Sequence, residues 1–104
     1  MTKLTDLTHV IRSKNAGPYE LTFDLMFRSD EEFHRVVDAD VITPALIAGL
    51  YNIPVRDVLG IIHFSPANAI KITIRRPIPS GNLGETDVYG AGQHAPLLDL
   101  AFEL

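Results

Sequence analysis

The chain has 104 residues, 46% of them hydrophobic, no cysteine and a formal net charge of -4 at pH 7. This length predicts one domain, residues 1–104, and the lack of thiols excludes cysteine catalysis and cysteine-ligated metals and favours the reducing cytoplasm. The acidic balance argues against nucleic-acid binding, and no apolar run approaches the roughly 20 residues of a membrane span.

The chain begins with two predicted strands. Apolar alternation indicates a strand over residues 7–12 and a clearer one over 21–28, where the bulky side chains share one face. Ser29, followed three residues later by Glu32, forms a capping-box signature. We therefore expect a helix to follow the second strand directly.

A second helix and a hairpin follow. Thr43 precedes a proline, which is a helix start signal, and Asn52 next to a further X-Pro pair predicts the helix end. Residues 58–64 and 69–75 are apolar runs separated by a short turn. In the second run the isoleucines alternate with polar residues, which predicts an antiparallel hairpin with one wet face.

The last third of the chain contains a long turn-rich segment. Residues 78–96 hold too many turn formers for a regular element, yet they are long for a plain connection. We expect a compact functional loop here. Alternation over residues 98–104 predicts a final strand.

These elements predict an α+β two-layer sandwich, in which a mostly antiparallel sheet of 4–5 strands carries two helices on one face. A ferredoxin-like topology is our first expectation, although a different open-faced sandwich fits the same pattern. The second face of the sheet is then half-apolar, which is typical of a face that packs on a partner. On the expected register it carries Thr8, Val10, Thr22, Asp24 and Met26.

The connection between the first two strands carries more polar chemistry than a turn requires. It contains a guanidinium, an ammonium, two small hydrogen-bonding side chains and a glycine, namely Arg12, Lys14, Ser13, Asn15 and Gly17. Together with free backbone amides these groups could all face one anion. The alternative is a solvated hairpin loop with ordinary surface cations.

The long loop supplies candidates for proton transfer. His94 with Asp87 to orient it could act as a general acid or base, and Tyr89 and Gln93 are candidate substrate contacts. In the structural alternative Tyr89 packs on the core, Asp87 caps a turn and His94 satisfies backbone groups. The sequence leaves both interpretations open.

The histidines do not suggest a metal site. His9, His34, His63 and His94 have no spacing that would pair them on a helix face, so we expect no metal, and no motif indicates a cofactor. His63 lies within an apolar run and is expected in the core.

Several segments together resemble the domain-of-unknown-function family numbered 4387 over essentially the whole chain. They are residues 12–22, Thr43-Pro44 with Leu50-Tyr51, Phe64 to Ala67, Arg76-Pro77, and residues 86–98 without Gly92. The first segment is also similar to the motif Arg-Ser-Gly-Asp-Lys-Gly in the carboxy-terminal, ferredoxin-like domain attached to the acyclic terpene utilisation family. This chain has Lys14, Asn15 and Ala16 where that motif has Gly, Asp and Lys.

The resemblance implies a small subunit or domain beside a larger catabolic protein that handles acyl or carboxylic-acid substrates. We therefore expect an accessory subunit that contributes an anion-binding loop to a shared site. Two alternatives stay open. One is a stand-alone hydratase, lyase or isomerase in which Arg12 and Lys14 hold a carboxylate and His94 or Asp87 moves a proton. The other is a small-molecule binding or regulatory module that self-associates into a homo-oligomer through its sheet.

Overall fold

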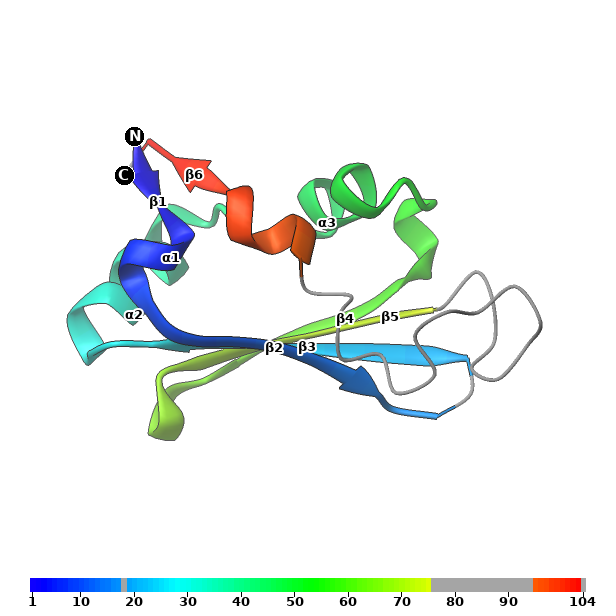
Figure 1. Ribbon diagram of the computed structural model, residues 1–104, viewed down its shortest axis with the longest axis horizontal. Helices are drawn as coiled ribbons and strands as arrows, with labels where there is room; N and C mark the ends of the chain where they lie inside the picture. Colours follow the sequence, from blue (N-terminus) through cyan, green and yellow to red (C-terminus); the bar gives the residue numbers. More distant parts are fainter. Residues whose placement is uncertain (18, 76–94, 104) are drawn as a thin grey trace.

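The computed structural model describes residues 1–17, 19–75 and 95–103 and has two layers (Figure 1). One layer is an antiparallel sheet in the order β2-β3-β5-β4, and the helices lie on one side of it. The strands are β2 (Thr8–Asn15), β3 (Glu20–Phe27), β4 (Val58–Phe64) and β5 (Ala69–Arg75), and the helices are α1 (Leu4–Leu7), α2 (Asp30–Ala39) and α3 (Pro44–Tyr51). The predicted α+β two-layer class is confirmed.

The connections do not confirm the ferredoxin-like topology. That topology follows the order β-α-β-β-α-β, with a helix inside each half. Here β2 and β3 form one antiparallel hairpin, β4 and β5 form another, and α2 and α3 lie between the two hairpins in sequence.

Among residues 1–17, 19–75 and 95–103, none of the helices has the length and apolar character that a membrane span requires.

The predicted final strand over residues 98–104 is wrong for most of its length. A 3-10 helix, η3 (Ala95–Asp99), occupies its start, and the Leu100 amide donates to the Leu97 carbonyl at 3.2 Å. The strand that remains, β6 (Ala101–Phe102), pairs with β1 (Thr2–Lys3) outside the main sheet. Leu97 is fully buried, so burial of this side chain through a helical turn prevailed over the alternating pattern.

The helix boundaries confirm the sequence signals at α3. The Thr43 hydroxyl accepts a hydrogen bond from the Leu46 amide at 3.2 Å, and Asn52 ends the helix in the left-handed conformation at φ 55°. At α2 the predicted capping box is only partly formed. Ser29 makes no side-chain bond to the helix backbone, and its hydroxyl instead donates to the Glu32 carboxylate. This bond lowers the pKa of Glu32.

The core lies between the sheet and the helices. Phe23 stacks on Tyr51 with ring centroids 4.9 Å apart, and Phe27 meets Phe33 edge-on at 5.9 Å. Burial raises the pKa of the Tyr51 phenol. The side chains with the least exposure come from both layers: Leu4, Phe23, Leu25, Ile47, Ile70, Ile72 and Leu97.

A β-bulge changes which face the start of β2 presents. The register with β3 shifts between Thr8 and Val10, so that Thr8 is buried and its hydroxyl donates to the Leu4 carbonyl at 3.0 Å. Thr8 was expected on the face of the sheet that points away from the helices, which we call the open face. That expectation is wrong, because the bulge inserts one residue and reverses the alternation. His63 is also exposed rather than in the core, since β4 is an edge strand covered from fewer sides.

Candidate functional site

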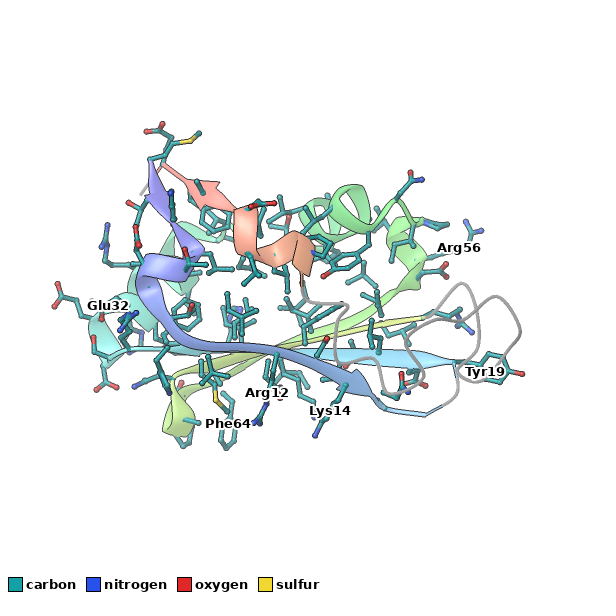
Figure 2. The ribbon with its side chains drawn as sticks, in the orientation of Figure 1. Arg12, Lys14, Tyr19, Glu32, Arg56 and Phe64 are labelled. Carbon is teal, nitrogen blue, oxygen red and sulfur yellow. The ribbon has the colours of Figure 1, made fainter. Side chains whose placement is uncertain are left out.

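The polar segment of residues 12–17 lies mostly in β2, and the strand divides its side chains between the two faces of the sheet. Arg12 and Lys14 lie opposite Asp24 and Thr22 of β3, and Figure 2 shows both cations directed away from the helices. Ser13 lies one residue along the strand, is buried and faces the helical layer. Because Ser13 points to the face opposite that of Arg12 and Lys14, these groups do not all converge on one anion as expected.

The remaining residues of the segment follow the same rule. Asn15 alternates with Lys14 and is half-buried on the face of Ser13. Gly17 follows in the hairpin turn at φ 137°, a conformation that a residue with a side chain rarely adopts. The turn is closed by the Ala16 amide, which donates to the Glu20 carbonyl at 3.0 Å. Gly17 therefore shapes the hairpin.

Arg12 is held in place by an ion pair across the hairpin. Its Nε donates to Oδ2 of Asp24 at 3.0 Å, and the side chains are 55% and 14% exposed. A guanidinium has five N–H donors, so this bond orients the group while further donors can serve a ligand. Pairing through Nε thus presents a pre-oriented cation on the open face.

Lys71 adds a third cation to the same face. It lies opposite Asp24 on β5, and Ile62 of β4 lies opposite Lys71, so that one row crosses all four strands. With strands about 4.8 Å apart, the backbones of Arg12 and Lys71 are about 10 Å apart on either side of Asp24. The side chains of Arg12 and Lys71 therefore flank Asp24 on the same face of the sheet.

These residues line a cleft of about 470 Å³ on the open face. This volume lies in the range of small-molecule sites. Its lining divides into a charged part and an apolar part: Arg12, Lys14, Asp24 and Lys71, followed by Met26, Ile62, Phe64, Ala67 and Ala69.

The apolar part is unusual in its exposure. Ile62 is 57% exposed and Phe64 is 52% exposed, although both belong to a regular strand. Figure 2 places Phe64 on the same side of the sheet as Arg12 and Lys14. Exposed apolar side chains beside charged ones are typical of a binding surface for an amphipathic ligand.

The charge of the cleft is opposite to that of the chain. Three cationic side chains and one carboxylate line it, whereas the whole chain has a net charge of -4. A local excess of positive charge on an acidic protein attracts anions to that place and away from the rest of the surface. The cleft is therefore suited to an anion with an apolar portion.

Four predicted site residues, Asp87, Tyr89, Gln93 and His94, lie outside the described residues. Within the described ranges, no three acidic or histidine side chains gather as a metal site would require. The sequence reasoning missed Lys71, Met26, Ile62 and Phe64 as site residues. Alternation in β5 does place Lys71 on the wet face, but only the strand order puts it beside Arg12.

The fold and the cleft thus define an α+β two-layer domain with a cation-lined open sheet face. The chain belongs to the family described as a domain of unknown function, DUF4387, which matches residues 4–101. No curated protein and no solved structure matches the chain.

Proposed function

We propose that this chain is a small accessory subunit that binds a carboxylate with a hydrocarbon portion and acts beside a larger catabolic enzyme. The observation that carries the proposal is the cleft in which Arg12, Lys14 and Lys71 border the exposed side chains of Ile62 and Phe64.

The charged end of the cleft suits a carboxylate head group. Arg12 can offer a planar pair of donors to two carboxylate oxygens, and Lys14 and Lys71 add point charges from two other positions. Asp24 occupies the centre of the row and limits the net charge. The positive charge that remains attracts an anionic head group.

The apolar end suits a short hydrocarbon chain. Met26, Ile62 and Phe64 form a surface that starts beside the cations and continues to the edge of the sheet. Each methylene that leaves water on this surface contributes about 0.8 kcal/mol. An acyl or other aliphatic acid would satisfy both ends.

The openness of the sheet supports an accessory role. Ligand sites usually bury most of the ligand, whereas the described residues that line this cleft lie on one face of the sheet and at its β4–β5 turn, and enclose a ligand from one side only. A second protein surface laid over the face would complete the enclosure. The similarity of the β2 segment to a motif in the carboxy-terminal domain attached to the acyclic terpene utilisation family supports a larger catabolic partner of this kind.

The chemistry of the described lining also favours binding over catalysis. Its ionisable groups are three cations and Asp24, whose carboxylate already accepts from Arg12. A proton-transfer enzyme needs an acid or base free to reach the substrate. In this proposal that group belongs to the larger enzyme.

Titration calorimetry with sodium octanoate tests the ligand. Acetate, which lacks the tail, and octylammonium, which reverses the charge, serve as control ligands. We expect octanoate to bind best and Arg12→Gln to weaken it about tenfold, the loss of about 1.4 kcal/mol. Arg56→Gln, an exposed arginine that does not line the cleft, is the control variant. Equal binding of octanoate and octylammonium would overturn the ligand assignment.

Affinity purification of the tagged chain from its source organism tests the partner. We expect a larger protein to copurify in fixed stoichiometry and to turn over an acyl or carboxylic-acid substrate faster with this chain than without it. A chain that purifies alone, or turnover of such a substrate by this chain alone, would contradict the accessory role.

A further inference from the structure

Exposed apolar side chains concentrate on and beside β4. Seven large hydrophobic residues are exposed in the described part of the chain, and four of them fall between Val55 and Phe64. These four residues are Val55, Leu59, Ile62 and Phe64. A concentration of this kind in one short segment marks a contact surface.

The strand β4 is also an outer edge of the sheet. Among the described strands it pairs with β5 alone, so its other side presents backbone donors and acceptors that can extend the sheet. Proteins usually protect such edges with charged residues or proline. Residues 58–64 contain neither, whereas the opposite edge strand β2 carries Arg12 and Lys14. Self-pairing of β2 would bring these cations together, and self-pairing of β4 would not.

The regular part of β4 is complementary to itself. A bulge interrupts the register between Val58 and Gly60, and from Gly60 onward the residues Gly60, Ile62 and Phe64 share the open face. A Cβ added at Gly60 would meet nothing within 4 Å, so there is open space above this glycine. An aromatic ring on a neighbouring strand often covers a glycine in this position.

We infer that two copies of this chain pair antiparallel through β4, with a two-fold axis at Ile62. In this register Ile62 meets the partner's Ile62, Gly60 lies under the partner's Phe64, and Ile61 lies opposite the partner's His63. Every pair joins residues on the same face, as a sheet requires. The two four-stranded sheets become one continuous sheet.

The pairing brings the two clefts into one surface. A two-fold axis normal to a sheet keeps both open faces on the same side. Because Ile62 and Phe64 line the apolar end of each cleft, these ends meet at the centre, and the two groups of cations lie at the outer flanks. This inference does not depend on the ligand proposed above, because its test contains no ligand.

Analytical ultracentrifugation over a range of protein concentrations tests the pairing. We expect the wild-type chain to form a reversible dimer and Ile62→Lys to raise the dissociation constant at least about tenfold, since like charges then lie directly opposite. Val55→Lys makes the same change at a β-branched residue of similar exposure, 54% against 57%, outside the paired stretch. We expect this control to dimerise as the wild type does.

A mixing experiment tests the register. Ile62→Glu should also be monomeric, but an equimolar mixture of Ile62→Glu and Ile62→Lys should form a heterodimer, because residue 62 faces its own counterpart. Far-ultraviolet circular dichroism shows whether each variant is folded. A monomeric wild type, equal effects of Ile62→Lys and Val55→Lys, or a mixture of folded variants that stays monomeric would overturn the inference.

Discussion

Arg12 and Asp24 face each other across the β2–β3 hairpin, with Nε of the arginine 3.0 Å from Oδ2 of the aspartate. The carboxylate has two opposing effects on the cleft. It orients the guanidinium, and it competes for the cation with any anionic ligand.

The variant Asp24→Asn removes the charge and keeps the shape. We expect octanoate to bind about threefold more tightly, because one negative charge near the ligand head group is lost in a solvated site. Stability should fall by less than about 1 kcal/mol, as is usual for exposed pairs. Calorimetry and urea unfolding measure the two quantities.

Asp57→Asn is the matched control for this prediction. It breaks the other ion pair described, in which Asp57 Oδ1 lies 3.5 Å from Arg75 Nε, and Asp57 does not line the cleft. An equal gain of octanoate affinity in both variants would contradict a local role for Asp24.

The two helix starts should differ in their sensitivity to substitution. Thr43→Ala removes a bond to the Leu46 amide and should lower the free energy of unfolding by about 1 kcal/mol. Ser29→Ala removes only a bond to the exposed Glu32 side chain, so its effect should be smaller. Urea unfolding of both variants at neutral pH makes the comparison, and a larger loss at Ser29 would show that α2 is capped in another way.

The half-buried phenol of Tyr51 should make stability fall in alkali. Its pKa is raised above the ordinary value of 10.0, so above about pH 10 the unfolded chain releases this proton while the folded chain retains it. Stability is then lost as the pH rises. We expect about 0.5 kcal/mol per pH unit, below the limit of about 1.4, because solvent reaches part of the ring.

Tyr51→Phe should remove this loss and keep the stacking on Phe23. Tyr19→Phe is the control, since Tyr19 is 57% exposed. Urea unfolding at neutral pH and at pH 10 to 11 measures the difference. The same alkaline loss in wild type and Tyr51→Phe would contradict the assignment.

The two faces of the sheet should respond differently to truncation. Ile72→Ala leaves a cavity at a fully buried position and should cost about 2 to 5 kcal/mol of stability. Ile62→Ala, on the open face, should cost less than about 0.5 kcal/mol in dilute protein. Thermal unfolding of both variants tests the sidedness, and equal losses would show that the open face is packed.

Strong periodic patterns predicted most of the elements. The alternation in β3 and β5 and the start and end signals of α3 are local, and the structure agrees with them. The helix α1 was not predicted, because four residues make a helix only when tertiary contacts hold them, here through buried Leu4 and Leu7. The bulge at the start of β2 was missed for a similar reason, since it depends on the partner strand.

The candidate site was predictable in part. Its cations were found as a cluster in sequence, but a strand sends neighbours to opposite faces, so Ser13 could not accompany Arg12. The residue that joins Arg12 in lining the cleft is instead Lys71. Lys71 is distant from Arg12 in sequence and comes near it only through the strand order β2-β3-β5-β4. Strand order depends on the packing of the whole domain, which no local pattern encodes.

The alternation that separates Arg12 from Ser13 also separates recognition from folding. The cations and exposed apolar groups of the cleft stand on one side of the sheet, and the large buried core side chains, such as Phe23 and Ile72, stand on the other. Replacing the first set requires no repacking of the second. Such a scaffold can change its ligand preference by substitutions on one surface, and its specificity can diverge among relatives while the architecture stays constant.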